Sequence, residues 1–416
     1  MKRTLRYAPF CGALILGMVV PLGLYAQETP FSPGSSLADP SLTALVDAAL
    51  ARDPAQELTP VLEREAQALA RRSRSWISGA PAIAAHWQDD AVLSDAGLRE
   101  GEVGLDLPLW WPDARQAARL LAEASAGEAK LHPRYNRWQA AGVVRERLWA
   151  LAMAQVDLAQ AQDAERSSTS LHEQVLARVR AGDMAQTDQL MSEQEMLAHQ
   201  AERQVAEREW AAQRASLRFL LGLEPDPGAL QPEPLGSIPP EDHPGLALLA
   251  QETRRAQAQW NQLLAQGAGA PVLQVGSRRE RSNREEDEVN SLGVGLSVPF
   301  AGAVHLGPER SAAERALAEA RLRWQQAVRE QTVAQQESEA SLRSAREALE
   351  LAQRRGDLAR RQQDLAQAAF GAGELDLMDL LRIREQARLT IREAERQRIK
   401  VGRETARFNQ VMGVVP

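Results

Sequence analysis

The chain has 416 residues and a formal net charge of −7, and aromatic residues make up only 4% of it. A mildly acidic chain without a basic tract is not typical of nucleic-acid-binding proteins, so no nucleic-acid partner is expected. The abundance of Ala and the scarcity of Phe and Tyr favour long helices over a thick aromatic core.

Residues 1–26 have the composition of a cleavable signal peptide. Lys2, Arg3 and Arg6 precede an apolar run of about fourteen residues, which is short for a membrane-spanning helix. We expect export, with cleavage after Ala26. Because the only cysteine of the chain lies within this segment, the mature protein is expected to contain no disulfide and no cysteine-based metal site.

The rest of the sequence contains one pattern twice. "VGLDLPLW" at 103–110 matches "VGLSVPFA" at 294–301, and "AGDMAQTDQL" at 181–190 matches "AGELDLMDLL" at 372–381. Both matches have the same offset, so the segments between them have equal length in the two halves. An internal duplication explains this agreement better than chance.

We therefore predict two structural repeats, 27–223 and 246–416. Between them, the prolines of a connector at 224–245 cannot lie inside a helix. Each repeat is predicted to contain a helix, two strands, a very long helix, a glycine turn and a returning helix. The strand pairs and hairpin tips are expected near 81–89, 101–110 and 181–187 in the first repeat, and near 271–279, 290–300 and 371–378 in the second.

The second strand of each pair alternates between apolar residues and small or polar ones. Such alternation places the apolar side chains on one face, and a tilted strand of about ten residues can cross a hydrocarbon layer. One interpretation is a soluble hairpin with its apolar face on a protein core. The other is a membrane barrel whose lipid-facing residues are Val103, Leu105, Leu107, Leu109, Leu292, Val294, Leu296, Val298 and Phe300.

Export, the small and polar opposite face, and the positions of Trp87, Trp110 and Trp111 near strand ends favour the membrane barrel. Four strands cannot close a barrel, because about eight is the practical minimum. The barrel interpretation therefore requires several chains.

The two long helices are far longer than a compact domain needs. Between Asp113 and Arg180 the only proline is Pro133, and between Glu309 and Phe370 there is none. At 1.5 Å per residue each helix is on the order of 100 Å long. The proline in the first helix predicts a bend or local unwinding there.

The second long helix carries two rows of regularly spaced residues. Small residues that step by three and four through 317–352 form a coiled-coil seam. A second row, at period seven, is expected on a different face. Two seams on one helix favour a ring with a neighbour on each side, although a simple coiled coil would explain the first seam alone. The second row consists of Val328, Gln335, Leu342 and Leu349.

Glycines mark the two hairpin tips. Gly182, and Gly371 with Gly373, are expected to supply the left-handed backbone at which a helix stops and reverses. Asp188 and Asp379 fall in the first turns of the returning helices, where a carboxylate is stabilised by the positive helix end. They either cap these turns or, in a multi-chain tube, surround the far opening and control entry or cation passage.

In their order, duplication and spacing, these strands and tips resemble the TolC family of outer-membrane efflux factors over essentially the whole mature chain. The compact size resembles the heavy-metal efflux branch. The resemblance implies a mainly α fold with a small β part, in which a homotrimer forms a 12-stranded outer-membrane β-barrel continuous with a long periplasmic α-helical barrel.

The resemblance also implies the partners and their contact residues. The tips would dock onto a periplasmic adaptor protein and, through it, an inner-membrane pump. Asp379 matches the first of two aspartates found at the constricted entrance of some members, and Arg382 occupies the position of the second. By this resemblance, the tip residues that would contact the adaptor are Ala181, Gly182, Asp183, Met184, Ala372, Gly373, Glu374 and Leu375.

Nothing in the sequence supports catalysis. There is no Gly-rich phosphate loop ending in GK[ST], and the six histidines are widely separated, so neither an enzyme nor a cofactor or metal site is expected. Two other functions remain as alternatives. A periplasmic adaptor would have one hairpin flanked by lipoyl-like and barrel domains, and a secreted structural coiled coil would not need two strand pairs.

Overall fold

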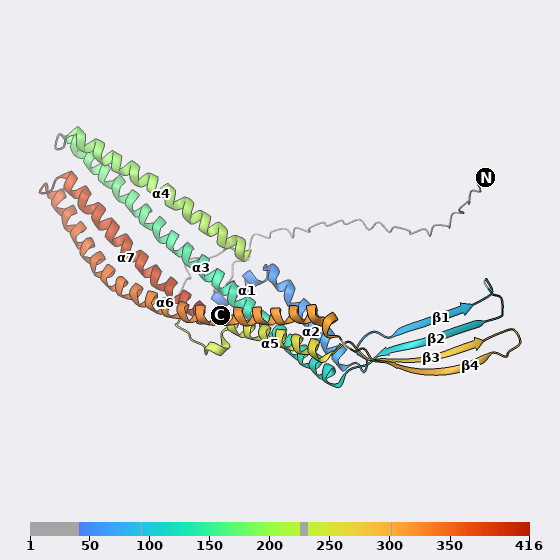
Figure 1. Cartoon of the computed structure of the whole chain (residues 1–416). Helices are drawn as coiled ribbons and strands as arrows, with labels where there is room; N and C mark the ends of the chain where they lie inside the picture. The colour runs from blue at the N-terminus through green and yellow to red at the C-terminus, as the bar shows by residue number, and fades with distance from the viewer. Residues whose placement is uncertain (1–40, 93, 225–231, 301) are drawn as a thin grey trace, which may run out of the picture. The chain divides into compact units, whose positions relative to one another are not determined.

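The computed structural model describes residues 41–92, 94–224, 232–300 and 302–416 (Figure 1). The predicted signal peptide and residues 225–231 of the connector lie outside these ranges. The α-helices are α1 (Leu42–Leu50), α2 (Leu58–Arg74), α3 (Pro112–Ala181), α4 (Gln186–Leu221), α5 (Pro244–Ala265), α6 (Ala303–Ala372) and α7 (Leu377–Val411). The strands are β1 (Ala82–Asp89), β2 (Arg99–Pro108), β3 (Val272–Arg281) and β4 (Val289–Ser297), and short 3₁₀ helices lie at Pro54–Glu57 and Pro240–Asp242.

Helices α3 and α6 dominate the fold, with 70 residues each. Helix α3 is continuous through Pro133, so of the predicted bend or local unwinding the unwinding does not occur. A proline removes only one backbone hydrogen bond from this long ladder, and α2 and α5 pack along the same part of α3. No helix in the described ranges combines the length and the apolar character needed to cross a lipid bilayer.

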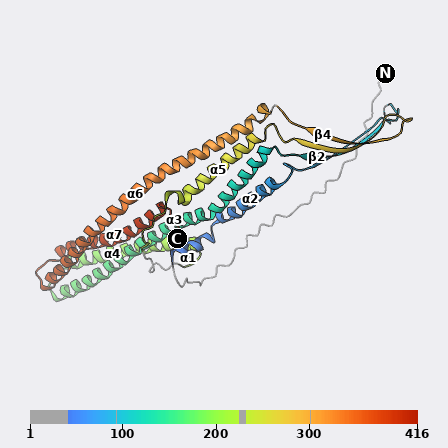
Figure 2. The same cartoon turned by 90° about the horizontal axis from the view of Figure 1, so that it is seen from below.

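The shorter helices lie end to end beside the long ones. Near the strands, α2, α3, α5 and α6 run side by side (Figure 2). Farther away, α4 and α7 take the places of α2 and α5 (Figure 1). Helix α1, which the sequence analysis did not predict, packs at the junction through Leu45 and Val46 against buried residues of α3 and α4. Because α3 also packs against α7, the two hairpins α3–α4 and α6–α7 form one continuous layer.

The second row predicted on α6 is covered only in part, since Val328 is 37% exposed whereas Leu342 is buried. Leu342 is only 6% exposed and lines a cavity together with Leu235 and Phe408 of the same chain, so its expected contact with a neighbour is wrong. A different row, Leu351, Leu358 and Leu365, is more than 60% exposed at a spacing of seven residues. Pattern alone could not distinguish the row that α7 and the connector cover from the row that they leave open.

The four strands form one antiparallel sheet in the order β1-β2-β3-β4. The central β2–β3 pair joins the two halves of the sequence, with Leu105 opposite Val275. Strand β4 ends before Val298 and Phe300, which are therefore not strand residues as predicted. Leu109 lies just beyond β2, where it forms an isolated bridge to Ile77. Prolines explain the early ends, because proline cannot donate to a ladder.

Candidate functional site: hairpin tips, interhairpin cluster and sheet face

Both hairpin tips reverse by the same backbone geometry. Gly182 follows α3 with φ of 83°, and Gly373 follows α6 with φ of 80°. In each turn two N–H groups donate back to carbonyls of the last helical turn, which completes a Schellman-type cap. Gly371 lies inside α6, so its predicted left-handed conformation is wrong. One positive φ is enough to end a helix in this motif.

The two aspartates in the returning helices have different surroundings. The Asp188 carboxylate accepts a hydrogen bond from the N–H of Ala185, at 3.2 Å, and so caps the start of α4. The cap of α7 is Asp376, whose carboxylate accepts from the N–H of Asp379 at 2.7 Å. The Asp379 carboxylate itself pairs with the guanidinium of Arg382 at 2.9 Å, and both side chains are largely exposed.

Arg178, which the sequence did not single out, connects the two tips. The Arg178 guanidinium donates to the carbonyls of Phe370 and Gly371, at 3.1 and 3.0 Å, and lies 4.8 Å from the centroid of the Phe370 ring. A positive charge in the last turn of a helix is common, so the sequence did not indicate that Arg178 contacts the other tip.

A buried apolar cluster lies directly behind the tips. It contains Leu171, Val175, Phe370, Leu377 and Leu380. Among the predicted contact residues, Met184 and Leu375 pack against this cluster, whereas Ala181, Gly182, Asp183, Ala372, Gly373 and Glu374 are exposed. The two tips therefore present their polar and small residues to the outside as one unit.

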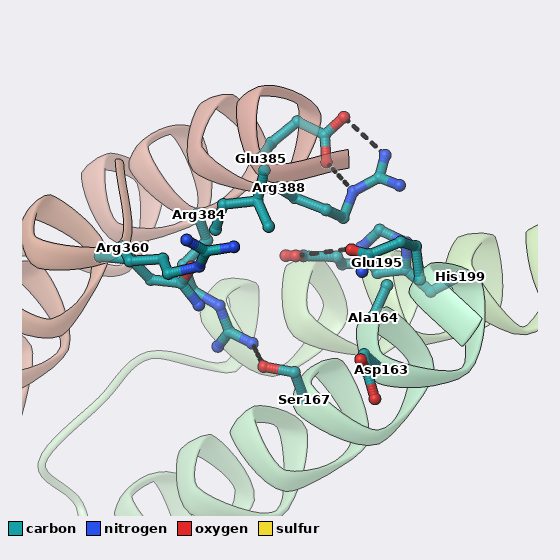
Figure 3. Close-up of a pocket in the computed structure, with 12 residues that line it drawn as sticks. Asp163, Ala164, Ser167, Glu195, His199, Arg360, Arg384, Glu385 and Arg388 are labelled. Atoms are coloured by element: carbon teal, nitrogen blue, oxygen red, sulfur yellow. Dashed lines mark hydrogen bonds and ion pairs between the residues drawn. The ribbon is translucent and has the colours of Figure 1, made fainter. Parts of the chain in front are cut away.

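Farther from the tips, polar residues of both hairpins meet around a cavity of 310 Å³ (Figure 3). The buried Arg384 of α7 reaches the hydroxyl of Ser167 on α3. Arg388 of α7 binds Glu385 through two hydrogen bonds and pairs with Glu202 of α4 at 3.1 Å. We call this set the interhairpin cluster; its members are Ser167, Glu195, His199, Glu202, Arg384, Glu385 and Arg388.

His199 lies between two carboxylates of α4. Its ring nitrogens are 3.5 Å from Glu195 and 3.4 Å from Glu202. The interaction with Glu195 raises the pKa of His199 above its ordinary value and Glu202 adds to this, whereas burial and Arg388 act in the opposite direction. With His199 protonated, the three cations of the cluster match its three carboxylates. Asp163 of α3 and Arg360 of α6 also line the cavity.

The raised pKa predicts how stability depends on pH. Protonated His199 stabilises the folded chain fully below its unfolded pKa of about 6.5, and this contribution disappears as the pH rises through the raised folded pKa. The thermal midpoint of the wild type should exceed that of His199→Gln by more at pH 5.5 than at pH 8.5. Midpoints that differ equally at both pH values would contradict the role of His199.

The sheet has one apolar face and one polar face. Directly paired residues lie on the same face, so the register aligns Ile83, Leu105, Val275 and Val294 in one row. On either side of this row are two further rows on the same face, one through Val103 and Leu292 and the other through Leu107, Leu273 and Leu296.

The opposite face contains glycines and polar side chains. Gly104, Gly276 and Gly293 align there, and Glu100 pairs with Arg278 at 2.6 Å. The apolar face is largely uncovered, since Leu292, Val294 and Leu296 are 88, 76 and 63% exposed. A soluble sheet normally covers such a face with helices or a second sheet.

No described metal site accompanies these features. Among residues 41–92, 94–224, 232–300 and 302–416, no group of three or more His, Cys, Asp or Glu side chains could hold a metal ion. Several of the described histidines make local contacts instead. His172 contacts the hydroxyl of Ser192 at 2.9 Å, and His243 accepts from the first N–H groups of α5.

No protein-family model and no curated protein matches the sequence. Solved structures do match. VceC, an outer-membrane protein of Vibrio cholerae, is 15% identical with a TM-score of 0.69, covering 89% of this chain and 96% of its own. The chain has the fold of the TolC-like outer-membrane channels.

Two further structures agree with this fold. The CmeC outer-membrane channel of Campylobacter jejuni is 14% identical with a TM-score of 0.67, covering 97% of this chain and 94% of its own. The open state of the MtrE outer-membrane channel of Neisseria gonorrhoeae is 14% identical with a TM-score of 0.66, covering 92% and 94%. At such low identity, the TolC-like fold is common to all of them while most side chains differ.

Proposed function

We propose that this protein is the outer-membrane channel of a tripartite efflux system, which conducts substrates passively from a periplasmic adaptor and an inner-membrane pump to the exterior. The observation that carries the proposal is the uncovered apolar face of the sheet, with Leu292, Val294 and Leu296 exposed. In lipid this face is favourable, whereas in water it would be costly. The TolC-like fold supports the same function.

The channel is completed by further copies of the chain. In the four-stranded sheet, β1 and β4 are edge strands with unpaired backbone groups, which a membrane does not tolerate. Three copies would supply the twelve strands that the family resemblance implies, above the minimum of about eight. We therefore propose a homotrimer whose sheets close into one barrel.

The helices support the same assembly. Helices α4 and α6 lie at the two edges of the helical layer. Helix α6 exposes Leu351, Leu358 and Leu365, and α4 exposes Leu190 and Leu197, also seven residues apart. Exposed leucines at this spacing are typical of a helix that packs against another helix. Edge α6 of one copy would pack against edge α4 of the next.

This assembly assigns roles to the two ends of the molecule. The apolar sheet face would contact outer-membrane lipid, and the exposed residues of the two tips would contact the adaptor in the periplasm. Export by a signal peptide at 1–26 agrees with this location. A periplasmic adaptor is not favoured, because the chain has two long hairpins rather than one. A secreted coiled coil is not favoured, because it would have no use for the exposed apolar sheet.

Outer-membrane fractions test the proposal directly. Cells that express the full-length chain should contain it in the outer membrane as a species that migrates at about three times the chain mass without heating and as a single chain after boiling. A protein that remained soluble in the periplasm, or that migrated as a single chain without heating, would contradict the proposed channel.

Asp379 and Arg382 are the proposed gate residues at the periplasmic entrance, with Asp188 as a cap. Multivalent cations added on the tip side should block the single-channel current less in Asp379→Ala than in the wild type. Because Arg382 neutralises this carboxylate at 2.9 Å, Arg382→Ala should strengthen the block. For such exposed charges the expected change in blocking concentration is about two- to fivefold. An unchanged block in both variants would contradict the gate role and leave Asp379 with a structural role at the start of α7 only.

A further inference from the structure

A second cavity lies between α3 and α7, close to the junction of the shorter helices. Its volume is 670 Å³, within the range of ligand pockets. Trp138, Val143 and Trp149 line it from α3, and Arg403 and Arg407 line it from α7. None of these residues belongs to the tips, the interhairpin cluster or the sheet.

Two glycines allow the helices to hold large side chains at this place. A Cβ at Gly402 of α7 would collide with the ring of Trp149, and a Cβ at Gly142 of α3 would be 2.8 Å from the side-chain amide of Gln410. The Trp149 ring is thereby fixed among Ala152 and Ala406. Trp138 is also fixed, because its indole N–H donates to the carbonyl of Gln410 at 2.9 Å. The two indole rings of the cavity wall are therefore held in defined positions.

Most of the lining residues of α3 lie on the side of that helix away from α1, whereas Trp138 and Arg145 also contact the connector residues His243 and Glu233. Ala141 and Val144 of α3 pack in the same core cluster as α1, and the helical period places Gly142, Glu146 and Trp149 on the other side. On α7, Asn409 donates to the connector carbonyl of Pro234 at 2.9 Å. Arg403 and Arg407 lie on a different side of that helix by the same period.

This arrangement implies which face lines the conduit. A tube that conducts must keep its interior clear, so α1 and the connector belong outside the ring of helices. The cavity then faces the lumen, where every transported molecule passes. This placement rests on the proposed function, whereas the cavity itself lies within a single chain.

The lining combines an apolar wall with an excess of positive charge. Arg403 has no ion pair among the described residues, and Arg407 has one long ion pair, to Glu404 at 4.0 Å. The third arginine of the lining, Arg145, is already bound to Glu233 at 2.7 Å. Glu146 is the only acidic residue that lines the cavity, so the guanidinium groups of Arg403 and Arg407 face a single lining carboxylate.

We propose that this cavity is a binding site for amphipathic organic anions with an aromatic or other rigid apolar body. The apolar body would lie against Trp149 and Val143, and the anionic group would accept hydrogen bonds from Arg403 and Arg407. Guanidinium groups bind carboxylates and sulfonates through paired N–H donors and also stack on flat rings, which suits such ligands. The site gives the conduit wall a weak preference for this class of cargo.

Equilibrium binding of naphthalene-2-sulfonate to the purified mature protein, held in an amphipathic polymer rather than detergent, tests the site. The double variant Arg403→Gln, Arg407→Gln should bind it about tenfold more weakly. The matched control is Arg398→Gln, an exposed arginine on the same helix that pairs with Glu395 outside the cavity. The control should bind as the wild type does, and a naphthyl ammonium ion of similar size should bind more weakly than the sulfonate.

Equal affinity in all three proteins, or equal affinity for the cation and the anion, would overturn the site. Single-channel conductance of the same three preparations separates this outcome from a failure of the proposed function. Loss of sulfonate binding in a variant that still conducts supports the site. A wild type that binds the sulfonate but never conducts would retain the site and reject the channel.

Discussion

Val275→Arg is expected to destabilise the assembled protein in its membrane by about 2–4 kcal/mol, which is the cost of an arginine near the middle of a lipid-facing strand. Val275 lies in the middle of the three apolar rows, between Leu105 and Val294. The measurement is the amount of heat-resistant oligomer in outer membranes, together with the urea midpoint of the protein refolded into lipid.

The neighbouring residue on β3 provides a matched control. Gln274 is exposed like Val275 but points to the opposite face, where it pairs with Asp106 and Gly295. Gln274→Arg should change the free energy of unfolding by no more than about 1 kcal/mol, because surface substitutions away from packed features have small effects. Equal losses in the two variants would show that both faces have the same surroundings, contrary to the proposed barrel.

Arg145→Met is expected to lower the free energy of unfolding by about 3–5 kcal/mol, as expected when one partner of a buried ion pair is removed. The Arg145 side chain is 3% exposed. It donates to both carboxylate oxygens of Glu233, to the side-chain oxygen of Gln410 at 2.6 Å and to the carbonyl of Val414 at 3.2 Å. Without the guanidinium, the Glu233 carboxylate keeps only the hydrogen bond from the Asn409 side-chain amide at 3.2 Å, and the Gln410 and Val414 oxygens lose this donor.

Arg137, two turns earlier on α3, is the control for this prediction. It pairs with Asp47 at 2.6 Å, but the carboxylate side chain is 57% exposed. Arg137→Met should therefore cost about 1 kcal/mol or less. Adding Glu233→Leu to Arg145→Met should restore part of the loss, since a buried pair can be replaced by apolar side chains. A loss for Arg145→Met no larger than for Arg137→Met would contradict the stabilising role of the buried Arg145–Glu233 pair.

The sequence predicted those parts of the fold that have a strong period. The alternation of Leu292, Val294 and Leu296 predicted both the strand and the face that these residues occupy. The equal offset of the two copies predicted hairpins of equal length, and α3 and α6 each have 70 residues. Period and repetition are properties of the local chain, so they can be read without knowing the neighbours of a residue.

Features that depend on distant partners could not be predicted in this way. Arg145 meets Glu233 and Gln410 only after the connector and α7 have folded onto α3. The two carboxylates beside His199 are local neighbours on α4, but the arginines of α7 that complete the interhairpin cluster are distant in the sequence. Similarly, Leu342 lies in a row with the correct period for an intermolecular seam, but packing within the chain buries this residue. Tertiary contacts decide between such alternatives, and they are invisible in the sequence.

The mass and the conductance of the purified mature protein test the central claim most directly, namely that one chain is only part of a channel. In a lipid-like environment, native mass spectrometry should find three chains in one particle, and the same particle should produce ion-conducting steps in a planar lipid bilayer. Particles of a single chain that are stable without detergent or lipid, and that never conduct ions, would contradict this account.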